Sequence, residues 1–224
     1  MYFGGGEMIK ILPSVLQAEK MEFFLTLLKK QKTINIDEIH LDIMDGVFVE
    51  NMCERLDEIT IVKKHGFKVD VHLMVAEPQK DILKSVSLGA DSITIHEEIK
   101  GFEDILELLK RIKNEKGIKI GVSIKPQTDL ELLKPYINDI DIVLLMSVEP
   151  GKGGQSFIEN TYSRIAKLRE ISQNVIIMVD GGINESNIRK IYELGADKAV
   201  VGSYLTKDIK NLENNLRSLK FKRE

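Results

Sequence analysis

The chain has 224 residues, of which 43% are hydrophobic and 30% charged, a composition typical of soluble globular proteins and not of disordered chains. The net charge is −3 and the pI is near 5.9, and the sequence has no cluster of basic residues that could bind nucleic-acid phosphates. We therefore expect no nucleic-acid partner. No apolar stretch reaches about 18 residues, so we expect no membrane span. The single cysteine, Cys53, excludes an intrachain disulfide and, without a secretory leader pattern, predicts a cytoplasmic protein.

Short β-branched runs recur along the chain and predict strands. In chain order they lie at residues 9–15, 38–44, 68–74, 92–97, 118–124, 141–147, 175–180 and 198–203. Segments between them, such as residues 19–30, 102–116 and 161–172, place apolar side chains at three- and four-residue steps, as amphipathic helices do. Alternating strands and helices with a unit of about 30 residues predict an α/β fold.

Eight such units in one chain favour a closed (β/α)8 barrel, or TIM barrel, while spacing alone leaves a doubly wound open sheet possible. The motif "LGAD" occurs at residues 88–91 and 194–197, before the fourth and eighth predicted strands. Two half-barrels would give this repeat, and so would ordinary turn chemistry. No linker or composition shift divides the chain. We therefore expect a single domain over residues 1–224, with residues 1–7 as a loose lead-in.

Polar side chains that are costly to bury share one face of several predicted strands. Because side chains alternate along a strand, His40 and Asp42 lie opposite the apolar residues of the second strand, and His72 does so in the third. Asp180 ends the seventh strand directly before two glycines. In a barrel this face points to the axis, and the C-terminal strand ends form the active site. Burying four such groups in one place costs free energy that a structural role alone does not explain. We therefore predict that one divalent metal ion is bound by His40, Asp42, His72 and Asp180.

The chemistry of these donors limits the choice of metal. Imidazole and carboxylate ligands suit zinc, iron, manganese or cobalt, and the sequence does not choose among them. Taken singly, each of the four residues is better explained as a hydrogen-bonded residue at a strand end. His96 also falls near a strand end, whereas His65 precedes a glycine at a predicted helix end and is expected to be a surface or capping residue.

Glycine-rich loops follow the last three predicted strands. "SVEPGKGGQSF" follows the sixth strand, "VDGGI" the seventh and "VGSY" the eighth. Backbone amides in such loops can bind phosphate, and a loop lysine could add a positive charge, although tight turns alone would also explain the glycines. Their joint position favours a small phosphorylated substrate. The candidate phosphate-binding residues are Gly151, Lys152, Gly153, Gly154, Gly181, Gly182, Gly202 and Ser203.

Taken together, these motifs resemble those of the ribulose-phosphate 3-epimerases. The matching pieces are "LPS" from Leu12, "HLDIMDG" from His40, "DVHLMV" from Asp70, "LLMSVEPGKGGQSF" from Leu144, "VDGGI" from Val179, "LGAD" from Leu194 and "VGS" from Val201. They occur in the family's order and span nearly the whole chain. The resemblance implies a barrel of the ribulose-phosphate-binding type. It also implies a metal-dependent isomerase that interconverts D-ribulose 5-phosphate and D-xylulose 5-phosphate in the pentose phosphate pathway.

The resemblance further implies roles for individual residues. Asp42 and Asp180 would be the general base and the general acid, exchanging roles with the direction of the reaction. Carboxylates on both sides of C3, next to the C2 ketone, suit inversion through an enediolate, whose charge a metal ion would stabilise. Ser14 and His72 would contact the sugar. The methionines that line the family's active site match Met44, Met74 and Met146. The family forms dimers or hexamers, so a homo-oligomer is expected.

Several positions depart from the family pattern. After "DGVFV" the family continues with Pro-Asn and soon Gly-Pro, whereas here residues 50–59 read "ENMCERLDEI", in a loop expected over the barrel mouth. "HEE" from His96 stands in place of His-Pro-Glu, "KPQTD" from Lys125 in place of Asn-Pro, and Lys152 in place of an aromatic residue. These departures keep every predicted metal and proton-transfer residue, and bear on the choice of sugar.

Three other functions compete with this one. An allulose-6-phosphate 3-epimerase would perform the same chemistry on a sugar with one more carbon. A phosphate-barrel lyase or decarboxylase is disfavoured, because such enzymes carry Asp-x-Lys-x-x-Asp at the third strand, where "DVHLMV" has His72 and Val75 at the last two defined positions. A non-catalytic sugar-phosphate-binding barrel is disfavoured by the intact set of histidines and aspartates.

Overall fold

The computed structural model describes residues 9–220, so the predicted lead-in at residues 1–7 lies outside the described residues. Its nine strands form one sheet in the order β1-β9-β8-β7-β6-β5-β4-β2-β3. All neighbouring strands pair in parallel except β3, which runs antiparallel to the end of β2. The strands are β1 (Lys10–Pro13), β2 (Glu38–Asp45), β3 (Met52–Cys53), β4 (Lys68–Met74), β5 (Ser92–His96), β6 (Lys119–Ile124), β7 (Ile142–Met146), β8 (Ile176–Asp180) and β9 (Lys198–Val201).

The sheet closes on itself between β1 and β2. Ser14 forms a parallel bridge with His40, and the Val15 N–H donates to the His40 carbonyl at 3.3 Å. The eight parallel strands therefore form a ring, with β3 as an addition at its C-terminal edge. Closure confirms the predicted (β/α)8 barrel and removes the open-sheet alternative.

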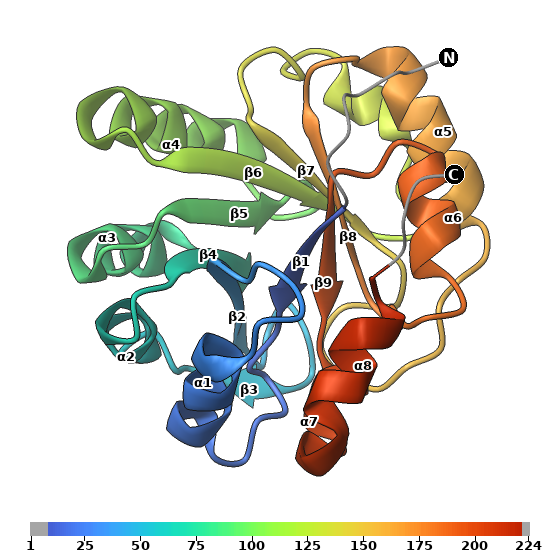
Figure 1. Cartoon of the computed structure of the whole chain (residues 1–224). Helices are drawn as coiled ribbons and strands as arrows, with labels where there is room; N and C mark the ends of the chain where they lie inside the picture. Colours follow the sequence, from blue (N-terminus) through green and yellow to red (C-terminus); the bar gives the residue numbers. More distant parts are fainter. Residues whose placement is uncertain (1–8, 221–224) are drawn as a thin grey trace.

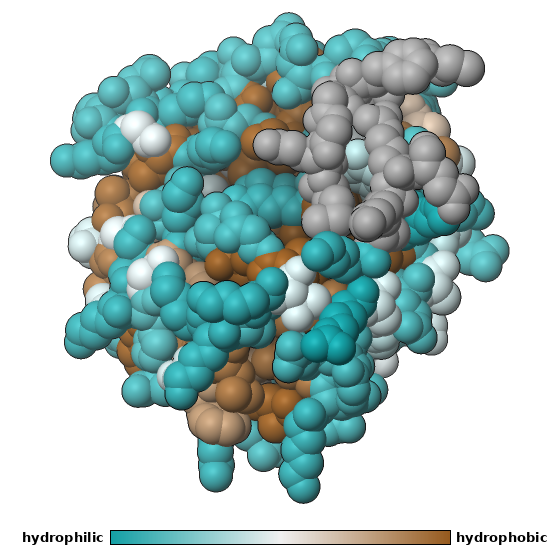
Figure 2. Space-filling view, viewed as in Figure 1, coloured by the Kyte–Doolittle hydropathy of each residue, from teal (hydrophilic) through white to brown (hydrophobic). Residues whose placement is uncertain are grey.

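Helices surround this ring (Figure 1). They are α1 (Met21–Lys30), α2 (Glu58–Lys64), α3 (Gln79–Leu88), α4 (Phe102–Lys116), α5 (Thr161–Ile171), α6 (Ile188–Glu193), α7 (Ser203–Thr206), α8 (Leu212–Ser218) and the 3₁₀ helices η1 (Leu130–Leu133) and η2 (Ile209–Asn211). After β6 the outer layer is η1 with its flanking turns instead of an α-helix. Nowhere in residues 9–220 is a helix long and apolar enough to cross a membrane. Figure 2 shows one face that is mainly hydrophilic, with patches of hydrophobic residues visible among the hydrophilic ones.

The alternation predicted for the strands is confirmed by their packing. Ile39, Leu41 and Ile43 of β2 belong to the large core between sheet and helices. The barrel interior divides into two halves. One half is apolar and is formed by Leu12, Ile142, Leu144, Met146, Val148, Met178 and Val200. The other half carries polar side chains that are 0% exposed: His40, Asp70, His72, Thr94 and His96. The candidate site lies where the two halves meet.

The "LGAD" motifs have the same structural role at both positions. Asp91 and Asp197 each accept, at 2.8 Å, the N–H of the second residue of the preceding strand. Asp141 accepts the corresponding N–H in β6 at 2.9 Å without belonging to such a motif. Because the device also occurs outside the repeat, local turn chemistry is sufficient to explain the repeated motif.

Candidate active site

Four ionisable side chains converge at the C-terminal ends of the barrel strands. His40 and Asp42 come from β2, His72 from β4 and Asp180 from β8, and one ligand atom of each lies within 4.8 Å of the others. Asp42 Oδ1 lies 3.2 Å from His40 Nε2 and from His72 Nδ1, and Asp180 Oδ2 lies 3.8 and 3.9 Å from these nitrogens. Ligands about 2.1 Å from a tetrahedral metal lie about 3.4 Å apart. The group could therefore bind one divalent cation.

Burial and mutual charge shift the proton affinities of these groups. Burial alone would raise the pKa of Asp42, but the neighbouring His40 and His72 bring it below its usual range. Burial, together with the Asp42 charge, raises the pKa of Asp180 to about 6. Burial alone would lower the pKa of His40, but Asp42 and Asp70 raise it well above its usual value. Added positive charge from a bound cation would favour the ionised form of both carboxyl groups.

His40 is held from behind by a second buried carboxylate. Its Nδ1 lies 2.7 Å from Asp70 Oδ2, and Ser92 donates its hydroxyl to the other oxygen of Asp70. An ionised carboxylate only accepts, so Nδ1 carries a proton, and a cation that displaces the proton from Nε2 would find the Nε2 lone pair facing the site. Sequence reasoning missed Asp70. The available signal was its place two residues before His72, on the same face of β4.

His72 is held by a longer arrangement. Its Nε2 lies 2.9 Å from His96 Nε2, and His96 Nδ1 lies 3.0 Å from Glu98 Oε2. Burial lowers the pKa of His96 to about 4, which makes it neutral at neutral pH. Partial burial would raise the pKa of Glu98, but hydrogen bonds from His96 and Thr128 lower it to about 2. His96 and Glu98 come from the "HEE" stretch, to which sequence reasoning assigned no role at the site.

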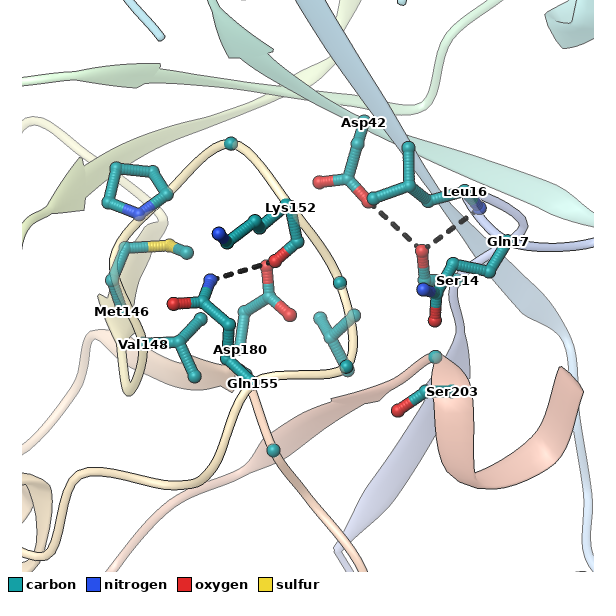
Figure 3. A pocket seen from close by; sticks show the side chains of 18 of the residues that line it. Ser14, Leu16, Gln17, Asp42, Met146, Val148, Lys152, Gln155, Asp180 and Ser203 are labelled. Atoms are coloured by element: carbon teal, nitrogen blue, oxygen red, sulfur yellow. Dashed lines mark hydrogen bonds between the residues drawn. The ribbon is translucent and has the colours of Figure 1, made fainter. Parts of the chain in front are cut away.

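One pocket joins the two aspartates to the glycine loops (Figure 3). Ser14 donates its hydroxyl to Asp42 Oδ2 at 3.0 Å beside this pocket. His40 and His72 are 0% exposed and are not among the residues that line it. The predicted site residues that line the pocket are Ser14, Asp42, Met44, Met74, Met146, Gly151, Lys152, Gly153, Gly154, Asp180, Gly181, Gly182, Gly202 and Ser203.

Two glutamines at the pocket were missed, because no motif marks them. Gln17 packs so closely on Gly153 that a Cβ there would lie 2.8 Å from Gln17 Cδ. Gln155 Nε2 donates to the carbonyls of Glu149 at 2.7 Å and of Lys152 at 2.8 Å, the latter bond being drawn in Figure 3. These contacts fix the shape of the glycine loop after β7.

The unusual stretch at residues 50–59 contacts the same glycine loop. It contains β3 and the start of α2. Asn51 Nδ2 donates to the Gly151 carbonyl at 2.7 Å, and Val49, just before the stretch, packs against Gly151, where a Cβ would lie 2.9 Å from Val49 Cβ. Arg55 anchors the stretch by donating to the Leu16 carbonyl at 3.1 Å. The position expected for this segment, at the mouth of the barrel, agrees with these contacts.

Comparison with known proteins identifies the family. A family model described as "Ribulose-phosphate 3 epimerase family" matches residues 10–206. The chain belongs to the ribulose-phosphate 3-epimerase family. A relative from Aquifex aeolicus, named ribulose-phosphate 3-epimerase, is 40% identical over 190 residues, covering 82% of this chain and 84% of the relative. A Bacillus subtilis protein with the same name is 33% identical over 230 residues, covering 95% of this chain and all (100%) of the relative.

Solved structures with low sequence identity share the fold. A crystal structure of KGPDC from Streptococcus mutans has a TM-score of 0.72 at 12% identity, covering 95% of this chain and 96% of that chain. The 3-hexulose-6-phosphate synthase from Salmonella typhimurium has a TM-score of 0.70 at 15% identity, covering 94% and 96%. At these identities the likeness concerns the barrel alone. The family and fold implied by the sequence motifs are thus confirmed.

Proposed function

We propose that this chain inverts C3 of a ketose phosphate and interconverts D-ribulose 5-phosphate and D-xylulose 5-phosphate. The proposal is carried by one observation, the two carboxylates of Asp42 and Asp180 in a pocket that also reaches the glycine loops. Membership of the ribulose-phosphate 3-epimerase family and the names of its relatives support the same reaction.

Inversion at C3 needs proton transfer on both sides of one carbon. C3 lies next to the C2 ketone, so removing its proton gives an enediolate, and returning a proton to the opposite side gives the epimer. We assign Asp42 as the base and Asp180 as the acid in one direction, with the roles exchanged in the other. The two carboxylates come from β2 and β8, which β1 and β9 separate in the ring, so they approach the pocket from different sides.

The two oxygens of Asp42 have different neighbours, which suggests different tasks. Oδ1 lies 3.2 Å from both imidazoles, whereas Oδ2 accepts the Ser14 hydroxyl at 3.0 Å. In our proposal Oδ1 belongs to the cation site and Oδ2 takes or returns the C3 proton. Ser14 then orients Oδ2 and contacts the sugar.

The residues that would hold one divalent cation are His40, Asp42, His72 and Asp180. When bound, a zinc, iron, manganese or cobalt ion supplies positive charge that stabilises the enediolate. Thioethers of Met44, Met74 and Met146 border the pocket. They are polarizable and, unlike hydroxyl or amine groups, bring no proton that could compete with the two carboxylates.

The phosphate of the substrate is assigned to the glycine loops after β7, β8 and β9. Gly182 has φ +64, and a Cβ at this position would lie 2.5 Å from the Phe157 nitrogen, so the loops after β7 and β8 pack backbone against backbone. Amides can approach an anion closely where no side chain intervenes. Lys152, in the first of these loops, would add positive charge.

Gly182→Ala is expected to raise KM for ribulose 5-phosphate at least about 10-fold, because the new methyl group forces the two loops apart where the phosphate binds. Left-handed backbone at a residue with a side chain costs about 1–2 kcal/mol by itself. Gly117→Ala is the matched control, since Gly117 has φ +71, with nothing within 4 Å of a Cβ, and does not line the pocket. Steady-state kinetics and urea unfolding of both variants separate the two effects. An unchanged KM in Gly182→Ala would contradict the phosphate assignment.

A panel of ketose phosphates assayed in D2O tests the reaction and the choice of sugar. We expect deuterium at C3 of ribulose and xylulose 5-phosphate, with kcat/KM at least about 10-fold above that for allulose 6-phosphate, since one extra carbon is worth about 10- to 200-fold in a fitted pocket. Faster reaction of the hexose phosphate would identify the sister epimerase. Binding of sugar phosphates without exchange at C3 would identify a non-catalytic barrel and overturn the proposal.

We also propose that the chain acts as a homo-oligomer in the cytoplasm and that residues 1–224 form one domain. The family resemblance supports the oligomer, the single cysteine fits a reducing compartment, and one continuous sheet supports the single domain. Light scattering on the purified protein should give the mass of a dimer or a hexamer, and a monomeric mass would contradict the first of these proposals.

A further inference from the structure

A line of three hydrogen-bonded groups, two buried imidazoles and a partly buried carboxylate, leads away from the candidate cation site. It begins at His72, continues through His96 and ends at Glu98 in the loop after β5. The two Nε2 atoms lie 2.9 Å apart, and His96 Nδ1 lies 3.0 Å from Glu98 Oε2. Both imidazoles are 0% exposed, so bulk solvent does not compete for these bonds.

The other oxygen of Glu98 determines how this carboxylate is used. Oε1 accepts the Lys125 N–H at 2.8 Å and the Thr128 hydroxyl. Oε2 is thereby left to His96. An ionised carboxylate has no proton to give, so His96 Nδ1 must be the donor of the bond between them.

The number of protons on each ring then determines the tautomer of both imidazoles. A neutral imidazole has one N–H, so His96 with its proton on Nδ1 presents a lone pair at Nε2. The contact between the two Nε2 atoms needs one donor, which is therefore His72 Nε2–H. His72 is left with its lone pair at Nδ1, which lies 3.2 Å from Asp42 Oδ1. Two acceptors this close need a cation between them, so this is the state of the cation-loaded site.

We infer that Glu98 and His96 are positioning residues that set the tautomer of His72, so that its Nδ1 is free to bind the cation. This inference rests on the cation site of the proposed function. His40 reaches the equivalent state in one step, through its bond of 2.7 Å to Asp70. The Nε2 of His72 faces the imidazole of His96 instead of a carboxylate. The carboxylate that sets the tautomer is therefore Glu98, which acts on His72 through His96. The reversed state, with His96 donating from Nε2, would place the His72 proton on Nδ1 and block the ligand atom.

The mouth of the barrel covers this line of groups. The Phe48 ring packs on His96 with centroids 4.7 Å apart, and the Lys125 ammonium lies 4.2 Å from the centroid of the Phe48 ring. Phe48 follows β2 in the stretch just before the unusual residues 50–59, and Lys125 also supplies the backbone N–H that Glu98 accepts. Phe48 thus covers His96, while the Lys125 backbone holds Glu98 in place.

Nitrogen NMR of the zinc-loaded wild-type protein tests the assignment directly. The chain has four histidines, so ¹⁵N-histidine labelling and two-bond proton–nitrogen correlations give a spectrum that can be assigned by substitution. We expect His96 protonated at Nδ1 only and His72 protonated at Nε2 only, with His72 Nδ1 shifted by the metal. A His96 proton at Nε2, or zinc bound at His72 Nε2, would overturn the inference.

The Glu98→Gln variant tests whether the Glu98 carboxylate sets the tautomer of His72, because glutamine has almost the same shape as glutamate. Lys125 N–H and the Thr128 hydroxyl hold the amide oxygen, so the amide NH₂ faces His96 Nδ1 and reverses every hydrogen bond in the line. We expect zinc affinity, measured by chelator competition without sugar, to fall about 10- to 100-fold, the usual effect of losing a partner of a ligating histidine. Glu97→Gln is the matched control, because Glu97 is outside this line of bonds, and its affinity should stay at the wild-type value.

A pair of variants at His96 distinguishes an orienting role from mere packing. His96→Gln keeps an amide oxygen that can accept the His72 Nε2–H, whereas His96→Leu fills similar space without an acceptor. The glutamine variant should bind zinc more tightly than the leucine variant. Equal zinc affinity of Glu98→Gln and the wild type would refute the inference even if epimerisation were found. Conversely, the expected tautomers in a protein that does not exchange C3 protons would remove the proposed function alone.

Discussion

Replacing Asp42 or Asp180 with asparagine is expected to lower the epimerisation rate of ribulose 5-phosphate at least about 1000-fold. Asparagine keeps the shape of aspartate but cannot take up the C3 proton, and general acid–base catalysis alone contributes about 10²- to 10⁴-fold. Each substitution also replaces one carboxylate of the candidate cation site by a neutral amide, which binds a divalent cation more weakly. Initial rates are measured with both epimers as substrates, and circular dichroism should show that the barrel is intact.

The control for these variants is Asp139→Asn. Asp139 is a surface carboxylate paired with Lys110 at 3.0 Å, its side chain is 45% exposed, and it does not line the pocket. Its loss should leave the rate unchanged. Metal content per chain is measured in parallel, so that failure of proton transfer at full metal occupancy is distinguished from loss of the ion. Wild-type turnover in either active-site variant would refute the assignment of two acid–base groups.

Removing the proposed metal ion with a chelator is expected to lower the rate at least about 100-fold. A cation beside the reacting oxygens contributes several kcal/mol to stabilising an enediolate, and each 1.36 kcal/mol is a factor of ten in rate. Adding back zinc, iron, manganese or cobalt singly should restore activity, with one ion restoring it best. Kinetics after chelation, after mock dialysis and after each addition provide the comparison.

Metal-free protein with the full rate would contradict this expectation. Some other group would then have to stabilise the charge that develops on the C2 oxygen. Among the residues that line the pocket, Lys152 is the only lysine or arginine, and it belongs to the glycine loop assigned to the phosphate. A Lys152→Met variant would show whether that residue had taken over the role.

Much of the barrel is predictable because its strands separate two different environments. In β2, Ile39 and Leu41 pack under the helices, while His40 and Asp42 point inward, and the period of two in the sequence shows this directly. Helix α4 coincides with the predicted residues 102–116 because its apolar stripe is long and regular. The sequence pattern does not predict β3 at Met52–Cys53. A strand of two residues has no period of its own and depends on pairing with Met44 and Asp45.

The residues of the candidate cation site are predictable from the sequence, whereas the groups that support them are not. The alternation of polar and apolar residues along the strands places His40, Asp42 and His72 on the inner face. Asp70 supports His40 across 30 residues of sequence, through the register between β2 and β4, which neither strand specifies alone. The bond between His72 and His96 similarly requires two side chains of adjacent strands to meet, and single-sequence patterns carry no such pairwise information.

Solvent-deuterium transfer in the wild-type enzyme tests the central claim, two carboxylates acting from opposite sides of C3, most directly. Ribulose 5-phosphate is mixed in D2O with excess metal-loaded enzyme, the reaction is quenched within the first turnover, and C3 of both sugars is analysed by NMR. Proton removal by one residue and return by the other predicts xylulose 5-phosphate that carries deuterium at C3, beside unreacted ribulose 5-phosphate that still carries protium. Xylulose 5-phosphate that retains the original C3 proton would show that a single group carries it from one face to the other and would contradict the account.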